Sequence, residues 1–317
     1  MNLRGNLALL NLDGHRLTAV WGAVHKDHVR IRGWCSTERP PDVDGSAPVA
    51  TGAWIGRTLK DAGCSMRQCI IAVPRASVVL KRLSFPTLSE SAEGDLAGMV
   101  QLQMARQLTM PLHGAAIDYV RLLPADGDEK HLSTEVLAAA LPGEQVTACR
   151  AMAKGAKLRL RSVALRGEGS AALFAQISYT QDGPVMGVSI TPQGVELGIV
   201  SEGRVVFSRA IEIAPPDSVE DWAPFSERVV VEAKRSRIGY RGAGELRDLV
   251  CVAMLGDDSL AASVGKALSE ELDLPWESVR FPNAVEIPSD IDGPTRAGLA
   301  PLIGLMLGAA INRPTYD

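Results

Sequence analysis

The chain of 317 residues is poor in aromatic side chains, which make up 4 % of it, and has no large excess of one charge. Its 33 Lys and Arg against 37 Asp and Glu give a net charge of −4, which provides no basic surface for a nucleic-acid backbone. With 46 % hydrophobic residues it can bury the core of about two domains. Since it has 30 Gly and 19 Pro, we expect an α/β protein with a Val, Leu, Ile and Ala core on short elements.

Paired cysteines and metal-ligand clusters are also missing from the sequence. The cysteines are odd in number and scattered, and His25, His28 and Cys35 have no fourth ligand at a suitable spacing. We therefore expect free thiols in a cytoplasmic protein and no metal site. No Gly-x-Ser-x-Gly motif marks a hydrolase nucleophile.

Long apolar runs are absent as well. The N-terminus carries an Asp within its apolar stretch, unlike a signal peptide. The stretch from Ala297 to Ile311 is shorter than the roughly 20 residues of a membrane span and is interrupted by Pro301. We expect it to form a buried helix over residues 294–311, and we expect no direct membrane span.

The order of the predicted elements indicates a fold. Short β-rich runs at 7–12, 18–24 and 28–34 predict an antiparallel meander, followed by a helix over 51–62 and a buried strand over 69–73. This order is that of the ribonuclease-H-like core of actin and the sugar kinases. A second meander over 184–213, helices over 224–238 and 259–272, and a strand over 249–255 repeat the pattern.

The middle of the chain differs from both halves. Strands over 77–85, 115–123 and 134–141 and helices over 89–108 and 143–154 predict a β-α-β-β-α module. We therefore predict three parts: residues 1–76 with 156–182 as a first core onto which helix 294–311 packs, 77–155 as an inserted subdomain, and 183–293 as a second domain.

A set of landmarks in the module resembles the type IV pilus assembly protein PilM family. Phe85-Pro86-Thr87-Leu88-Ser89 follows a strand, Met110-Pro111 follows an acidic helix, and Asp118-Tyr119 begins the next strand. The resemblance implies an actin-like fold of the FtsA branch, related to the cytoplasmic domain of GspL. It implies a cytoplasmic scaffold, peripheral to the inner membrane, in a type IV pilus or type II secretion-like platform.

The same resemblance implies the partners. They are the short cytoplasmic tail of a PilN-like single-span membrane protein and, further, an assembly ATPase. In the family the tail lies in a groove between the first core and the inserted subdomain, and the walls expected here are Val79, Leu83, Phe85, Met104, Leu108, Met110 and Tyr119. Each of these side chains has a core role as its alternative, and periodicity does not separate the two.

Actin-like ATPases hold phosphates between two hairpin turns, each led by an Asp that serves the magnesium. In the first hairpin the leading acid is replaced by Asn11, and the turn reads Asp13-Gly14-His15-Arg16. The second hairpin has Ser189 as its leading residue, then Thr191 and Pro192, and the adenosine loop contains Gly256 and Asp257. A carboxylate at 4 Å from a phosphate charge costs about 1 to 4 kcal/mol, depending on the local dielectric.

These replacements predict a degenerate nucleotide site, no cofactor and no catalysis. An ATP-binding switch or weak ATPase that takes Mg-ATP weakly is the alternative, with Arg16 or His15 as a phosphate ligand. A metabolite kinase is disfavoured because neither hairpin offers the metal-binding acid. The segment 214–223 is short, which predicts a reduced subdomain in the second half. The basic run Lys154, Lys157, Arg159, Arg161 and Arg166 is expected to be a solvated face, or a contact for acidic lipid or an acidic tail.

Overall fold

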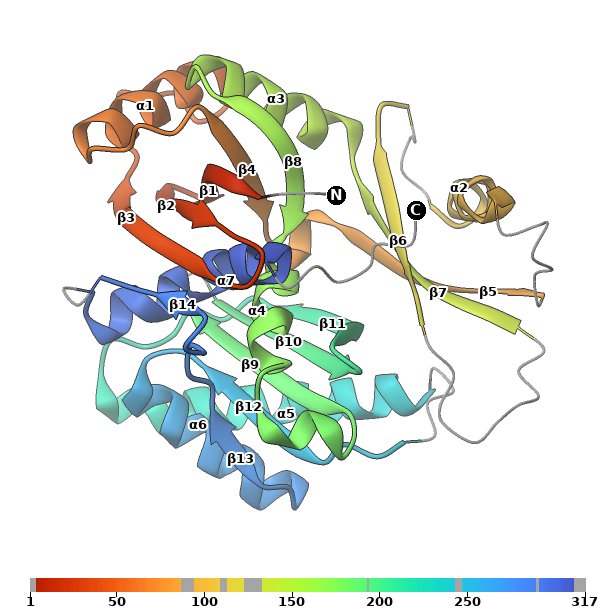
Figure 1. Cartoon of the computed structure of the whole chain (residues 1–317). Coiled ribbons are helices and arrows are strands. Elements are labelled where there is room, and N and C mark those ends of the chain that lie inside the picture. Colours follow the sequence, from red (N-terminus) through yellow and green to blue (C-terminus); the bar gives the residue numbers. More distant parts are fainter. Residues whose placement is uncertain are drawn as a thin grey trace.

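The computed structural model describes residues 4–86, 94–108, 113–122, 133–192, 194–242, 247–288 and 291–310. These residues form a six-stranded, a five-stranded and a three-stranded sheet. The two larger sheets lie one above the other, and the three-stranded sheet stands to one side (Figure 1).

The six-stranded sheet has the order β14-β3-β2-β1-β4-β8. The antiparallel meander predicted at the N-terminus forms its β1 (Gly5–Asp13), β2 (Arg16–Val24) and β3 (Val29–Glu38). β4 (Gln68–Val73) is parallel to β1, β8 (Arg159–Leu165) is parallel to β4, and β14 (Val285–Glu286) is parallel to β3. The order of strands agrees with the prediction for the first core, whereas β14 was not predicted.

Helices α1 (Pro48–Asp61) and α3 (Gly143–Gly155) cover the outer face of this sheet. Trp54 and Ile55 of α1 and Cys149 of α3 are buried in one apolar cluster with Leu10 and Ile71 of the strands. α3, which the sequence analysis grouped with the inserted subdomain, thus packs with the first core. The apolar stripe on α3 predicts a buried face but does not identify the sheet that covers it.

The five-stranded sheet has the order β11-β10-β9-β12-β13. Its strands are β9 (Val185–Thr191), β10 (Gly194–Ser201), β11 (Arg204–Ile211), β12 (Cys251–Leu255) and β13 (Trp276–Ser278), and only β13 was not predicted. Helices α5 (Trp222–Gly242) and α6 (Asp258–Leu272) cover its outer face. Between β11 and α5 the chain forms one short 3-10 helix (Val219–Asp221), in keeping with the reduced subdomain.

Two helices fill the space between the large sheets (Figure 1). α4 (Arg166–Phe174) and α7 (Gly293–Ala310) pack against each other, and α7 continues through Pro301. They approach closely at Gly169 and Gly304, where a Cβ atom on Gly304 would lie 2.0 Å from the Gly169 carbonyl oxygen. None of the described helices has the length and apolar character needed to cross a membrane.

The three-stranded sheet has the order β5-β7-β6 and is covered on its outer side by α2 (Leu96–Gln107) (Figure 1). Its strands are β5 (Val79–Pro86), β6 (Ala116–Arg121) and β7 (Ser133–Leu141). A 3-10 turn (Arg75–Ser77) leads into it from β4, and a second one (Ser178–Gln181) follows α4. Leu83, Val100, Met104 and Val136 form the centre of its separate small core.

The cysteines are free thiols, and Cys69, Cys149 and Cys251 are buried. Burial raises the pKa of the Cys69 thiol to about 12, with a further contribution from Cys149 nearby. These thiols are therefore protonated at neutral pH and fill space as small apolar side chains. Among the described residues no three His, Cys, Asp or Glu side chains gather as metal ligands would.

Candidate functional site

The first predicted phosphate hairpin is the β1–β2 turn. Gly14 has a φ of +59°, a left-handed conformation that glycine adopts without a steric penalty. His15 and Arg16 are both held by the end of β3, because Arg39 contacts the His15 ring nitrogen at 2.9 Å and Arg16 donates to Glu38 at 2.5 Å. Both side chains are thus engaged by residues of the first half of the protein.

The residues at the two leading positions are neutral and buried. Asn11 in β1 is 4 % exposed, and its Oδ1 atom has no hydrogen-bond partner among the described residues. Ser189 in β9 accepts a hydrogen bond from the Ser170 hydroxyl at 3.3 Å, and Thr191 donates to the Gly194 carbonyl at 3.2 Å. Two of these three side chains are thus engaged within the fold, and none supplies a carboxylate to a metal ion.

The loop expected to hold adenosine follows β12. Asp257 caps α6, since its Oδ1 atom accepts hydrogen bonds from the backbone N–H groups of Ser259 at 3.1 Å and Leu260 at 3.3 Å. Gly256 borders a cavity of about 650 Å³ between the start of α6, the segment 278–288 and the first turns of α7. Asp257 has a structural role, whereas a hollow remains beside Gly256.

Replacing Asp257 with alanine is expected to lower the free energy of unfolding by about 1 kcal/mol, because two N–H groups of α6 lose their acceptor. Urea denaturation measures this change. Asp258→Ala is the matched control, because Asp258 lies in the first turn of α6 and not at the cap, so its loss should cost only a few tenths of that. Equal effects for the two variants would contradict the capping role.

Arg166, the first residue of α4, lies between the two hairpins. It is 5 % exposed, and its Nη1 atom donates to Asp13 Oδ2 at 2.7 Å. Its Nη2 and Nε atoms both donate to Glu196 Oε1, at 2.7 and 3.1 Å. Burial lowers the pKa of Arg166, but Glu196 and Asp13 more than offset this, so the net shift is upward and the guanidinium stays charged. We call this three-residue contact the arginine bridge.

Glu196 also has a hydrogen-bond donor outside Arg166. Its Oε1 atom accepts a hydrogen bond from the backbone N–H of Arg75 at 3.2 Å. The Arg75 side chain donates to the carbonyl of Ser208 in β11 at 3.3 Å and to that of Val78 at 2.6 Å. The turn that leads into the three-stranded sheet is therefore tied to the second half at the same point.

The sequence analysis missed both central residues of this site. It placed Arg166 on a solvated basic face, which is wrong, because Arg166 ends the run at the start of α4 and is buried between the sheets. The available signal was Glu196, a lone carboxylate within the apolar strand that runs from Val195 to Val200. A buried charge in a strand requires a partner of opposite sign.

These residues do not fit a magnesium nucleotide. The space between the hairpin ends holds a guanidinium that is already paired with two carboxylates. A phosphate entering there would meet Asp13 and Glu196 at close range, and each like-charge contact at 4 Å costs about 4 kcal/mol at an effective dielectric constant of 20. The neutral side chains Asn11 and Ser189 offer no compensating carboxylate for the metal.

The expected groove residues lie elsewhere than predicted. By strand register Val79, Leu83 and Phe85 share one face of the three-stranded sheet with Val136 and Ala138. This is the face that α2 covers. The small core there contains Leu83, Phe85 and Met104, and Leu108 and Tyr119 pack against it, whereas Val79 shares the face by register alone. Met110 lies outside the described residues.

The opposite face of that sheet points toward the first core. It carries Leu80 of β5, which pairs with Ala139 of β7. Both are half-buried and lie at the margin of the first core's apolar cluster, together with Val163 and Leu165 of β8. Among the described strands β8 pairs with β4 alone, so its outer edge is open on the side where the three-stranded sheet stands (Figure 1).

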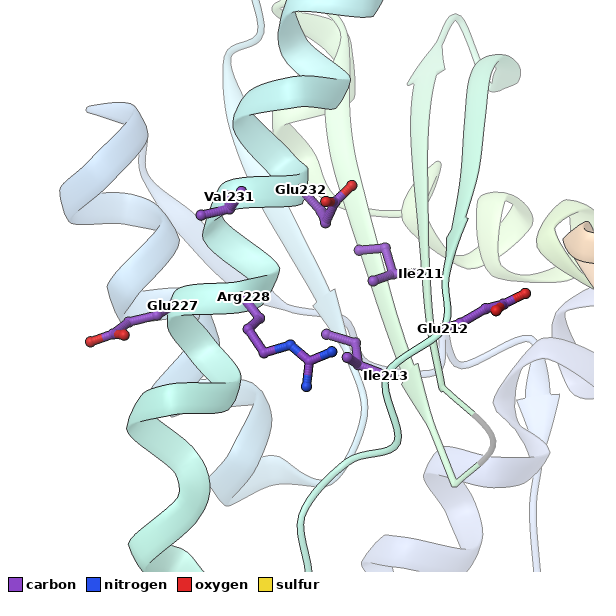
Figure 2. A pocket seen from close by; sticks show the side chains of 7 residues that line it. All are labelled: Ile211, Glu212, Ile213, Glu227, Arg228, Val231 and Glu232. Atoms are coloured by element: carbon purple, nitrogen blue, oxygen red, sulfur yellow. The ribbon is translucent and has the colours of Figure 1, made fainter.

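A further hollow of about 330 Å³ lies on the second half, between the end of β11 and α5 (Figure 2). Its walls are Ile211, Glu212, Ile213, Glu227, Arg228, Val231 and Glu232. Glu232 already pairs with Arg209 at 2.9 Å and with Arg235 at 2.5 Å. None of the residues that line the hollow belongs to the expected nucleotide site or to the residues expected to bind a partner.

No model of a known protein family matches the chain, and no curated protein matches its sequence. Solved structures do match it over nearly its whole length. A chain of a PilM-PilN type IV pilus biogenesis complex superposes with a TM-score of 0.74 at 18 % identity, covering 99 % of this chain and 100 % of that one. The protein has an actin-like fold.

Two other neighbours support this assignment. The cytoplasmic domain of EpsL, an inner membrane component of the type II secretion system of Vibrio cholerae, matches with a TM-score of 0.53 at 7 % identity, covering 98 % of this chain and 96 % of that one. A Bacteroides thetaiotaomicron protein with an actin-like ATPase fold and unknown function matches with a TM-score of 0.50 at 9 % identity, covering 96 % of each chain. The predicted resemblance to PilM is confirmed at the level of the fold.

Proposed function

We propose that this protein is a non-catalytic scaffold of a type IV pilus or type II secretion-like assembly platform. The observation that carries the proposal is the full-length match to PilM in a complex with PilN, at a TM-score of 0.74. The match to the cytoplasmic domain of a type II secretion component supports the same class of role. On this proposal the protein works in the cytoplasm, at the inner membrane, through a PilN-like single-span partner.

The proposed docking site for the partner's cytoplasmic tail is the open edge of β8, beside the inner face of the three-stranded sheet. An edge strand can accept an extended peptide through main-chain hydrogen bonds, with pockets for alternate side chains. Half-buried apolar side chains border this edge on both sides, namely Leu80, Ala139, Val163 and Leu165. An assembly ATPase would be a further partner of the complex.

Tail binding gives a direct test. Synthetic peptides that match the cytoplasmic tails of single-span proteins encoded next to this gene are titrated against the full chain by calorimetry. Leu80→Glu should weaken binding at least tenfold, because it places a charge among the apolar side chains beside the β8 edge. Leu102→Glu is the control, since Leu102 on α2 is 55 % exposed and faces away from β8.

Two results would contradict the proposed docking site. One is equal loss of binding in both variants, and the other is tight binding that Leu80→Glu leaves unchanged. Failure of every tail and of every intact partner to bind would contradict the scaffold itself.

The second candidate is an ATP-binding switch or weak ATPase on the same fold. The cavity beside Gly256 and the unpartnered Asn11 Oδ1 atom favour it. The arginine bridge opposes it, because the phosphate position is filled by side chains. Mg-ATP titration separates the two candidates, and a micromolar affinity would favour the switch.

A further inference from the structure

The arginine bridge connects the two halves of the protein. Asp13 is the last residue of β1 in the six-stranded sheet, and Glu196 is the third residue of β10, directly after the β9–β10 turn, in the five-stranded sheet. A single guanidinium reaches both carboxylates, at 2.7 Å each. The bridge therefore connects the two halves at the ends of the β1–β2 and β9–β10 hairpins.

The bridge is buried at Arg166 and Glu196 and half-buried at Asp13. The Arg166 side chain is 6 % exposed and the Glu196 side chain is 7 % exposed. Asp13 is more accessible, with 24 % of its side chain exposed. Salt screens a buried ion pair only weakly, and water has little access to replace its hydrogen bonds.

The positive and negative charges of the arginine bridge balance within the protein, as the charges of a metal ion and phosphates balance in a bound ligand. In an actin-like ATPase the hairpins of both halves converge on phosphates and a metal ion, so the ligand connects the halves. Here the guanidinium supplies the positive charge, and the chain itself supplies the anions. All three groups are covalently part of the protein, so their contact does not depend on any ligand concentration.

We infer that Arg166 takes the place of the metal–phosphate bridge and holds the two halves closed without a ligand. The turn at Arg75 strengthens the closure, because its N–H donates to Glu196 while its side chain reaches β11. The inserted sheet, which begins directly after this turn, is thereby held in one orientation relative to the second half. The inference does not depend on the identity of any partner.

Amide hydrogen exchange on the full chain tests the closure. In Arg166→Met the amides of residues 13–16 and 194–196 should exchange at least tenfold faster than in the native protein, and by a larger factor than those of α1. Arg16→Met is the matched control, because Arg16 pairs with Glu38 at the surface and should leave both hairpins as they are. Unchanged exchange at the hairpins of Arg166→Met would overturn the inference.

Arg166→Lys provides a second variant that keeps the charge. An ammonium is a point donor and cannot present the planar fork that reaches two separate carboxylates. We expect faster exchange at the same two hairpins, by a smaller factor than in Arg166→Met. Native exchange rates in Arg166→Lys would show that bridging is not what closes the cleft.

Mg-ATP added to the native protein completes the test. Since the position is already filled, we expect no slowing of exchange at either hairpin at millimolar nucleotide. A tenfold slowing at both hairpins would mean that the carboxylates move aside for the nucleotide, and it would overturn the inference. Loss of tail binding would bear on the scaffold alone, so the two proposals fail separately.

Discussion

Replacing Arg166 with methionine is expected to lower the free energy of unfolding by about 3–5 kcal/mol, the usual cost of removing one partner from a buried ion pair. Methionine has a similar length but no donor, so Glu196, which is 6 % exposed, loses its cation and keeps only the Arg75 N–H of the donors that the structure describes. Urea denaturation at pH 7 measures the loss.

The β1–β2 hairpin takes part in a surface ion pair, Arg16 with Glu38, and in a buried one, Asp13 with Arg166, and the two can be compared. Arg16→Met removes the pair with Glu38, whose side chains are 39 % and 71 % exposed, and should cost less than about 1 kcal/mol. A triple variant, Asp13→Asn, Arg166→Met and Glu196→Leu, should recover most of the loss, because an apolar replacement of a whole buried ion pair is often neutral. Equal losses of unfolding free energy for Arg166→Met and Arg16→Met would show that the buried bridge stabilises the protein no more than a surface ion pair.

Gly304→Ala is expected to lower the free energy of unfolding by about 1–3 kcal/mol or more, the cost of overpacking a close contact. The new Cβ atom would lie 2.0 Å from the Gly169 carbonyl oxygen, which is backbone and cannot rotate away. α4 and α7 would have to separate, and the central layer between the sheets would lose contacts. Urea denaturation again measures the effect.

Gly308→Ala, one turn later on α7, is the matched control. A Cβ atom there would lie 3.6 Å from the Cβ atom of Ala172, an ordinary van der Waals distance. Since alanine is the better helix former, this variant should gain about 0.5–1 kcal/mol. The prediction for the helix contact fails if both variants change stability in the same direction.

Much of the fold could be predicted from the sequence, because its signals are local. Alternating apolar runs with short turns predicted the meanders, and helical periodicity predicted α5 and α6. β13 and β14 were missed because three and two residues are too few for a pattern to develop. The faces on which elements pack were also missed, since periodicity shows that Leu83 and Phe85 share a face but not which neighbour covers it.

The candidate site divides in the same way. Asn11 and Ser189 were predicted to replace metal-binding acids, because the order of strands aligned their hairpins with those of actin-like ATPases, and this stays a prediction. The arginine bridge could not be predicted, since Arg166 is 153 residues from Asp13 and 30 from Glu196 along the chain. Only the stacking of the two sheets around α4 brings these residues together.

The position of α7 has a consequence for how the chain is made. α7 supplies Leu299, Leu302, Ile303, Met306 and Leu307 to the core that also covers Leu7, Leu9 and Val20 of the first strands. During translation, nearly 300 residues are therefore synthesised between these N-terminal strands and the helix that completes the cover of their inner face. Until α7 has docked, this apolar sheet face is open to association with other chains.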